Sequence, residues 1–238
     1  MKTLRKHSFF VLVSFVAATT CCAQTAEEIV AKNLDAIGGK DLIATTKSVV
    51  MTSNLELAAM GINVPTTTTI VAGKGFKSET DFQGTKIITA VTDHSGWSVN
   101  PPNGINTPTA MSDAELKKAK HQLEITPFSN YTANGGKIEL LGKDTADYKI
   151  KLTNDDGFNG TFYVNMKTYL IDKADVQVTM QGQDIDVAVM YSDYRKLDNG
   201  LLFPFKIERD MPQFSMSITT QKVEVNKEID PAIFEMPK

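Results

Sequence analysis

The chain has 238 residues, of which 42% are hydrophobic and 22% are charged, and its formal net charge is −3. This slightly acidic balance argues against a nucleic-acid-binding protein, because such proteins need a basic face. A chain of this length can bury enough apolar surface to be stable as one domain without disulfides. After residue 23, no apolar segment is long enough to form a membrane-spanning helix.

The first 23 residues have the pattern of a secretory signal peptide. Three basic residues lie within the first six, and the apolar run Phe9–Ala18 follows them. That run is shorter than the roughly 20 apolar residues that span a bilayer. We predict cleavage after Ala23, which leaves residues 24–238 as a single exported domain in the periplasm.

The chain's two cysteines, Cys21 and Cys22, suggest an alternative fate for this segment. Lipid modification of either cysteine would tether the protein to a membrane instead of releasing it. The residues before them lack the large aliphatic side chain that usually marks a lipidation site, so we favour the released, soluble form.

The exported part begins with a predicted amphipathic helix. Thr25 and Glu28 form a capping box, in which each side chain accepts a hydrogen bond from the other residue's backbone. Apolar residues then recur at helical spacing as far as Ile37. Gly38-Gly39 is typical of the left-handed conformation that ends a helix.

The next residues alternate between apolar and polar, or are rich in β-branched residues, which predicts strands. Short turn sequences separate them, and Pro101-Pro102 ends the series because proline cannot donate a ladder hydrogen bond. The predicted strands in this part are Val49–Leu57, Thr66–Val71, Phe76–Phe82, Lys86–Thr92 and Gly96–Asn100.

The connection Leu57–Val64 is unusual because its middle is apolar, whereas a turn is normally polar. Two interpretations remain open. The segment folds over the mouth of the sheet, or it forms an apolar tip that contacts a membrane or delivers cargo. We name Leu57, Met60 and Ile62 as candidate cargo-exchange residues.

A second helix is predicted after a loop at Asn103–Met111. Ser112 starts another capping box, and Leu116, Ala119 and Leu123 lie on one helix face. Strands then continue to the end of the chain, separated by turn pairs. They are Lys137–Leu141, Tyr148–Leu152, Thr161–Met166, Leu170–Met180, Asp184–Tyr191, Leu202–Arg209 and Phe214–Val225.

The resulting fold class is mainly β with two helices. A curved antiparallel sheet of about eleven strands is expected to form an incompletely closed β-barrel, with the helices as a lid. Residues on the apolar side of the strands would then line one cavity. The predicted lining residues are Phe76, Val91, Trp97, Val178, Val189, Phe205 and Met216. For Trp97, a purely structural role as a core anchor is the alternative.

Four segments carry a resemblance to the periplasmic lipoprotein-carrier superfamily (LolA/LolB-like), in particular its outer-membrane lipoprotein-sorting members. They are AEEIVAKNLDAIGGKDLI near the start, DHSGWSVNP at 93–101, YSDYRKLDNGLLFPFKIE at 191–208 and VEVNKEIDPAIFEMP at 223–237. Together they extend the resemblance over residues 24–238. It implies an unclosed barrel with a helical lid and an apolar cavity that shields acyl chains.

The same resemblance implies a functional arginine on an early strand. This chain has no arginine between Lys6 and Arg195, so the identity of the cargo stays open. We expect a carrier or binding protein for a lipid or an acylated lipoprotein, with transient membrane contact. An envelope sensor that binds lipidated ligands and a partner protein is the alternative. We expect no catalytic residue, metal or cofactor, because the two histidines after residue 23, His94 and His121, lie in no recognisable catalytic pattern.

Overall fold

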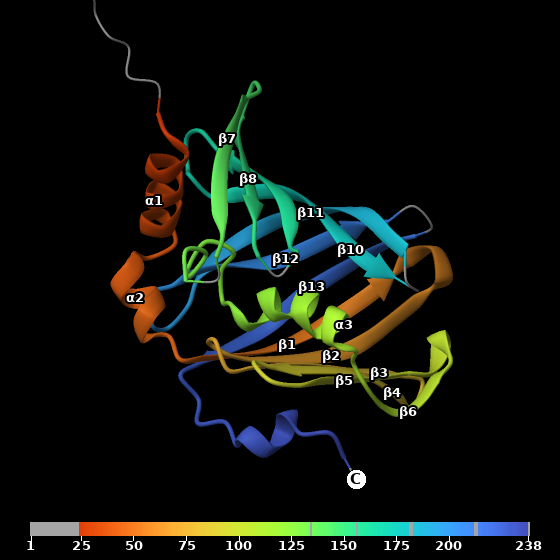
Figure 1. Cartoon of the computed structure of the whole chain (residues 1–238). Helices are drawn as coiled ribbons and strands as arrows, with labels where there is room; N and C mark the ends of the chain where they lie inside the picture. Colours follow the sequence, from red (N-terminus) through yellow and green to blue (C-terminus); the bar gives the residue numbers. More distant parts are fainter. Residues whose placement is uncertain (1–23, 134, 156, 181–182, 212–213, 238) are drawn as a thin grey trace, which may run out of the picture.

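The structure, a computed structural model, describes residues 24–133, 135–155, 157–180, 183–211 and 214–237. The predicted signal peptide, with Cys21 and Cys22, lies outside these residues. Thirteen strands form one antiparallel sheet (Figure 1). They are β1 Ser48–Leu57, β2 Ile62–Val71, β3 Gly75–Phe82, β4 Thr85–Thr92, β5 Gly96–Asn100, β6 Ile105–Ala110, β7 Lys137–Lys143, β8 Asp147–Thr153, β9 Asn159–Asn165, β10 Ile171–Met180, β11 Gln183–Lys196, β12 Leu202–Asp210 and β13 Ser215–Val225.

The strand order is β6-β5-β4-β3-β2-β1-β13-β12-β11-β10-β9-β8-β7, so β1 and β13, from opposite ends of the described chain, are neighbours. Strands β6 and β7 form the two edges and do not pair with each other. The sheet is therefore curved but not closed, and the predicted fold class of an incompletely closed barrel with helices is confirmed.

Three α-helices and four 3-10 helices accompany the sheet in the described residues. Both predicted capping boxes are present, with Thr25 at the start of α1 and Ser112 at the start of α3. No helix among the described residues is long and apolar enough to cross a bilayer. The bounds are α1 Ala26–Ala36, α2 Lys40–Thr45, α3 Asp113–Ala119, η1 Ala58–Met60, η2 Pro101–Asn103, η3 Lys120–Leu123 and η4 Pro231–Phe234.

Three local expectations need correction. Helix α2 was not predicted, because six residues are too few to display a helical period. Strand β6 lies within the predicted loop Asn103–Met111. It is exposed except at Ile105, so its sequence has no apolar alternation, and only its ladder with β5 defines it. Strand β2 begins at Ile62, so the predicted loop Leu57–Val64 shrinks to Ala58–Gly61.

The main core lies between α1, α2 and the inner face of the sheet. Ile29 and Leu34 of α1 and Ile43 of α2 pack into one cluster with Ile150 of β8 and Phe162 of β9. Phe203 and Phe205 of β12 belong to the same cluster. We call the sheet face that takes part in this cluster the concave face.

A second, smaller cluster lies on the same face near the other edge of the sheet. Val91 of β4, Ala119 of α3 and Leu123 of η3 are buried together, with Phe76 of β3 and Leu116 of α3 packed against them. Helix α3 thus covers strands β3 and β4, whereas α1 packs beside β7 at the opposite edge (Figure 1).

Candidate functional site

An apolar row crosses the concave face at right angles to five strands. Directly opposite residues of an antiparallel pair lie on the same face, so the register places these side chains together. The row consists of Tyr191 of β11, Ile207 of β12, Ile218 of β13, Leu55 of β1 and Val64 of β2. Only Val64 is fully buried; the other four are half-buried.

A second row runs beside it and includes one charge. It passes through Leu140, Ile150, Phe162, Ala174, Val189, Arg209 and Met216, from β7 to β13. Arg209 is exposed and forms no ion pair within the described part of the chain. Burial raises the pKa of Tyr191, and the nearby positive charge of Arg209 partly opposes that rise.

These two rows lie toward one end of the sheet, at which β1, β3, β10 and β12 end and β2, β4, β11 and β13 begin. We call this end the mouth. Nearer the middle of the sheet, the concave face of β13 and β1–β3 carries buried hydroxyl groups instead. Ser53 and Thr220 are hydrogen-bonded at 3.2 Å, and Thr66 and Thr80 at 2.9 Å.

The segment 112–123, which contains α3 and η3 and which we call the lid, is attached to one half of the sheet. Just before it, the Met111 backbone N–H donates to the Gly96 carbonyl of β5 at 2.8 Å. At its end, the Gly73 N–H of the β2–β3 turn donates to the Leu123 carbonyl at 2.9 Å. Ala119 and Leu123 provide its buried apolar contacts, and Leu116 packs beside them. The lid is therefore fixed to β2–β5.

Toward the other half of the sheet the lid makes polar and aromatic contacts near the surface. Lys118 Nζ lies 2.9 Å from Asp184 Oδ1 at the mouth end of β11, and both side chains are nearly half exposed. The His121 ring lies 4.9 Å from the Phe158 ring, next to β9. Figure 1 shows α3 in front of the strands, between the two halves of the sheet.

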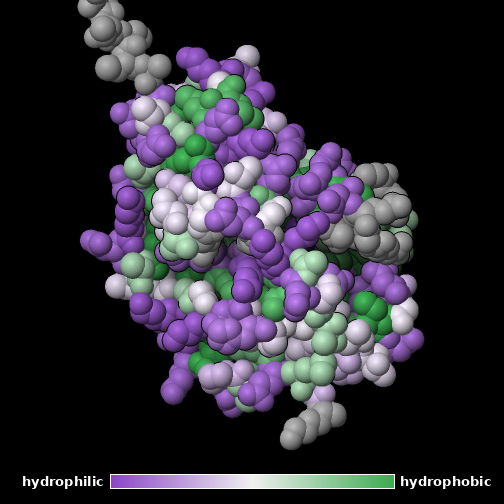
Figure 2. Space-filling model, in the orientation of Figure 1, coloured by the Kyte–Doolittle hydropathy of each residue, from purple (hydrophilic) through white to green (hydrophobic). Residues whose placement is uncertain are grey.

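The surface on the lid side is mixed in character. Figure 2, in the orientation of Figure 1, shows hydrophobic surface in separate patches between hydrophilic side chains. Over the whole surface of the described residues, the large apolar side chains with the greatest exposure are Met60, Leu141, Met190 and Met236. Met60, at 61%, is the most exposed of these and lies at the β1–β2 tip beside the mouth.

Six of the seven predicted lining residues lie on the concave face, but at different places. Phe76 and Val91 are cross-strand partners beneath the lid. Val189 and Met216 belong to the second row, on either side of Arg209. Val178 lies further toward the mouth on β10, where it is half-buried opposite Ile185, and Phe205 belongs to the main core.

Trp97 does not join this face, and its assignment to the shared surface is corrected. It pairs with Ala90, the neighbour of Val91, so its side chain points to the opposite, convex face. There its indole N–H donates to the Phe234 carbonyl at 2.8 Å, and Trp97 is 3% exposed. Trp97 is thus the core anchor of the C-terminal segment. The five residues of β5 are too few for their alternation to show which face of the sheet Trp97 occupies.

The C-terminal segment also borders a pocket on the convex face. Its volume is about 380 Å³, and Phe234, Ile229 and Val71 line its apolar part. Asp93 and His94 lie at its edge, with His94 Nε2 3.0 Å from Asp93 Oδ2 in an exposed pair. The pocket contains none of the predicted lining residues.

The three candidate cargo-exchange residues occupy two different environments. Leu57 and Ile62 close the β1–β2 ladder as direct partners, and both are half-buried on the concave side of the mouth. Met60 alone projects from the connection, where Gly61 adopts the left-handed conformation with φ of 63°. The segment is therefore a tight hairpin with an apolar tip, not a long loop over the mouth.

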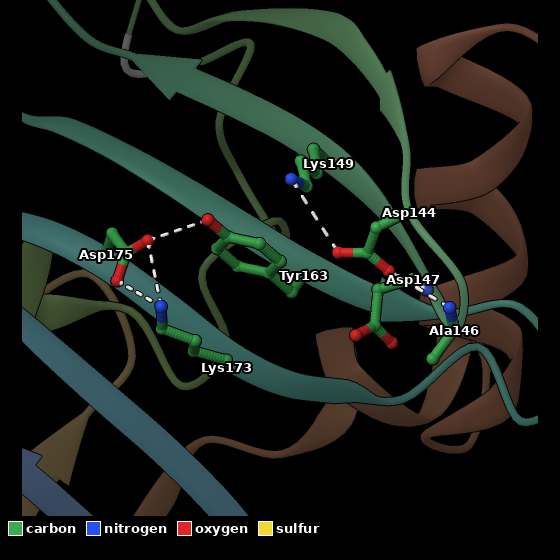
Figure 3. A network of polar contacts seen from close by, with 7 residues as sticks. All are labelled: Asp144, Ala146, Asp147, Lys149, Tyr163, Lys173 and Asp175. Atoms are coloured by element: carbon green, nitrogen blue, oxygen red, sulfur yellow. Dashed lines mark hydrogen bonds and ion pairs between the residues drawn. The ribbon is translucent and has the colours of Figure 1, made fainter.

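Charged groups gather on the convex face of β8–β10 (Figure 3). The Tyr163 hydroxyl donates to Asp175 at 2.8 Å, and this bond and burial raise the pKa of Tyr163 to about 12. Lys173 also pairs with Asp175, at 2.9 Å. Tyr163, Lys173 and Asp175 are thus satisfied by one another, and no cluster of metal-ligating side chains occurs in the described residues.

Sequence reasoning missed two features of this site. Arg209 follows Phe203, Phe205 and Ile207 at the same two-residue spacing, so the alternation of β12 carried a signal for its direction. The contact between Lys118 and Asp184 joins segments 66 residues apart. No local sequence pattern predicts such a contact.

Comparison with known proteins agrees with this geometry. No protein-family model matches the sequence, and no curated protein matches it. Among solved structures, a LolA superfamily protein from Nitrosomonas europaea has a TM-score of 0.59 at 13% identity, covering 90% of this chain and 98% of its own. The chain has a LolA-like fold.

Two further solved structures have similar values. A DUF1329 family protein from Desulfovibrio piger has a TM-score of 0.60 at 13% identity, with 90% of this chain and 98% of its own covered. A putative outer membrane lipoprotein-sorting protein domain from Vibrio parahaemolyticus has a TM-score of 0.56 at 13% identity, with 88% and 97% covered. At this identity the likeness describes the fold.

Proposed function

We propose that this protein is a periplasmic carrier or binding protein that shields the acyl chain of a lipid or lipoprotein on the concave face. The observation that carries the proposal is the apolar row of half-buried side chains beside a lid fixed to one half of the sheet. The LolA-like fold of the chain supports this proposal, because one solved structure with a similar fold is named as a putative outer membrane lipoprotein-sorting protein domain. The protein acts by binding, without catalysis.

Burial of the acyl chain supplies the affinity. Each methylene removed from water contributes about 0.8 kcal/mol, so a long chain offsets the cost of ordering it. The Lys118–Asp184 pair is exposed and contributes at most about 1 kcal/mol to lid closure. Arg209, between Val189 and Met216, is placed to contact an anionic headgroup while the chain lies along the apolar row.

The decisive experiment compares two adjacent residues of β13 that face opposite sides. Ile218 belongs to the apolar row, whereas Thr219 points to the convex face and is exposed. In titrations with a fluorescent fatty-acid methyl ester, which has no anionic head, Ile218→Asp should weaken binding at least tenfold, and Thr219→Asp should bind like the wild type. Trp97 emission reports the fold of each variant independently, because that ring lies on the other face.

Equal binding by wild type and a folded Ile218→Asp protein would refute the concave-face site. If Ile218→Asp fails to fold, Ile218→Thr gives the same comparison with a milder change. A loss of binding in the Thr219→Asp protein would also count against the proposal, because that residue lies outside the concave face.

We further propose that the exposed tip at Met60 helps transfer cargo to or from a membrane. Met60→Asp should slow transfer of a bound fluorescent lipid to acceptor vesicles while its equilibrium binding and melting temperature stay nearly unchanged. Asn103→Asp, at the exposed tip between β5 and β6, is the control. Transfer at the wild-type rate by the Met60 variant would show that the tip has no role.

Export and removal of residues 1–23 are part of the same proposal. The intact mass of protein isolated from its native envelope should correspond to a chain that begins at Gln24. A diacylglyceryl group on Cys21 or Cys22 would instead make the protein a membrane-tethered carrier.

A further inference from the structure

A pocket of about 500 Å³ lies away from the mouth, where four segments meet. Helices α1 and α2, the β2–β3 turn and residues 124–130 after the lid contribute to its wall. Leu34 and Ile43, which are 4% and 8% exposed, provide an apolar floor, and Ile125 packs against the same cluster. A volume of several hundred Å³ with an apolar floor is typical of small-molecule sites.

The rim of this pocket is positively charged. Lys40, Lys47 and Lys74 line it, each from a different part of the wall, and all three are exposed. None of them forms an ion pair in the part of the chain that the structure describes, although Lys47 Nζ donates to the Ala44 carbonyl at 2.7 Å. Glu124 is the acidic lining residue, and its carboxylate accepts from Ser129 and Asn130.

The positive charge around this pocket is opposite in sign to the net charge of the whole protein. Three lysines and one glutamate line the pocket, whereas the chain has 25 basic and 28 acidic residues. Exposed lysines without ion pairs attract anions, and the attraction is stronger beside a low-dielectric apolar wall. An apolar floor beneath a cationic rim complements an amphiphile with one apolar chain and an anionic head.

We propose that this pocket binds a single-chain amphiphile with a carboxylate or phosphate headgroup, with the chain on the Leu34–Ile43 floor and the head among the three lysines. The site is separate from the concave-face rows, because none of their residues lines it. The proposal therefore stands or falls independently of the acyl-carrier function. Its occupant would be a free amphiphile, whereas the concave face would hold the acyl chain of the cargo.

The test is calorimetric titration of the purified Ile218→Asp protein, in which the concave-face site is blocked, with lauric acid, lauroyl lysophosphatidic acid and lauroyl lysophosphatidylcholine, each below its micelle concentration. Saturable binding of at least one anionic compound should be ten or more times tighter than binding of the zwitterionic one. The tighter of the two anionic compounds identifies the preferred head. Each methylene removed from the chain should weaken binding by up to about fourfold.

Two variants assign the binding to this pocket. The triple change Lys40→Gln, Lys47→Gln and Lys74→Gln should weaken anionic binding at least tenfold and leave the zwitterionic compound unaffected. Its control replaces Lys137, Lys143 and Lys167, which are exposed and do not line the pocket, in the same way and should bind like the parent protein. Ala44→Trp fills the pocket from an exposed position of α2 and should prevent binding of every compound.

Several results would overturn the proposal. One is equal binding by the triple variant and its control. Another is anionic binding that survives Ala44→Trp, since the ligand would then lie elsewhere. Binding to vesicles of anionic lipid without saturable binding of any monomeric amphiphile would also overturn it, because the lysines would then serve only as a surface patch. All of these titrations use the Ile218→Asp background, in which the concave-face site is blocked, so failure at one site leaves the other claim untouched.

Discussion

The two halves of the concave face are covered in different ways. On one half, a single cluster of seventeen buried residues joins α1 and α2 to β8–β10 and β12. Over β2–β4, the lid contributes two buried side chains, Ala119 and Leu123, which meet Val91. Because apolar burial dominates stability, the first half should carry most of the free energy of unfolding. The lid half can open locally at a much smaller cost.

The halves also differ in polarity. The concave face of β8–β10 is built from aliphatic and aromatic residues, whereas β13 and β1–β3 place two buried hydroxyl pairs on it. Ser53 with Thr220 and Thr66 with Thr80 are satisfied in these pairs. Hydroxyls contribute less apolar burial than aliphatic groups of the same size. The lid therefore lies over the half of the sheet that is held together less strongly.

The largest expected effect comes from the well-covered half. Phe162 is 2% exposed, and its ring lies 5.0 Å from that of Phe128. Phe162→Ala should lower the free energy of unfolding by about 3–5 kcal/mol, because it leaves a cavity in the main core. Urea denaturation measures this loss. Thr161→Ala, one residue earlier on the other face, should cost less than about 1 kcal/mol.

Leu123→Ala tests the stability of the lid half against that of the well-covered half. Leu123 is 5% exposed and belongs to the small cluster, so we expect a loss of about 2 kcal/mol, at the lower end for buried leucines. Hydrogen exchange should accelerate in residues 112–123 and stay unchanged in β8–β10. Uniform acceleration over the whole sheet would show that the two halves unfold as one unit.

The hydroxyl pair at Thr66 and Thr80 should give a smaller and context-dependent effect. Thr66→Val leaves the buried Thr80 hydroxyl without its partner, which costs about 1 kcal/mol or slightly more. Thr66→Val combined with Thr80→Val removes both polar groups and should restore most of that loss. A double variant as unstable as the sum of the single variants would contradict this account of the polar half.

Much of this architecture was readable from the sequence because it is periodic. The alternation of β12 placed Phe205 on the concave face, and the capping boxes at Thr25 and Ser112 located α1 and α3. Strand β6 was missed because it is exposed except at Ile105 and so lacks alternation. Its pairing depends on backbone hydrogen bonds, which side-chain patterns do not reveal.

The candidate site was less predictable than the fold because it depends on contacts between distant segments. Trp97 lies opposite to its expected face because its place is set by Phe234, 137 residues later. The pocket beside Lys40 and Lys74 brings together four segments, none of which has a motif of its own. Strand periodicity predicts the direction in which a side chain points, but its neighbours depend on how the whole chain folds.

The smallest expected effect concerns the convex face of the well-covered half, near the β7–β8 turn. Asp147 has a buried Oδ1 without a hydrogen-bond partner among the described residues. Burial, reinforced by Asp172 and Asp144, raises its pKa. Its neighbour Asp144 accepts from the backbone N–H groups of Ala146 and Asp147, which lower the pKa of Asp144 (Figure 3).

The two carboxylates should therefore affect stability with opposite signs. The folded pKa of Asp147 lies above its unfolded value of about 3.9, so its ionised form opposes folding at neutral pH, and that penalty vanishes as the pH falls below the unfolded value. Asp147→Asn should raise the melting temperature by about 1 °C at pH 7 and by nothing at pH 3. Asp144→Asn should lower it at pH 7, with the difference shrinking as the pH falls through the depressed pKa of Asp144. Melting curves of the three proteins at pH 3, 5 and 7 measure both. A gain for Asp147→Asn that persists at pH 3 would show that amide packing, not the charge, is the cause.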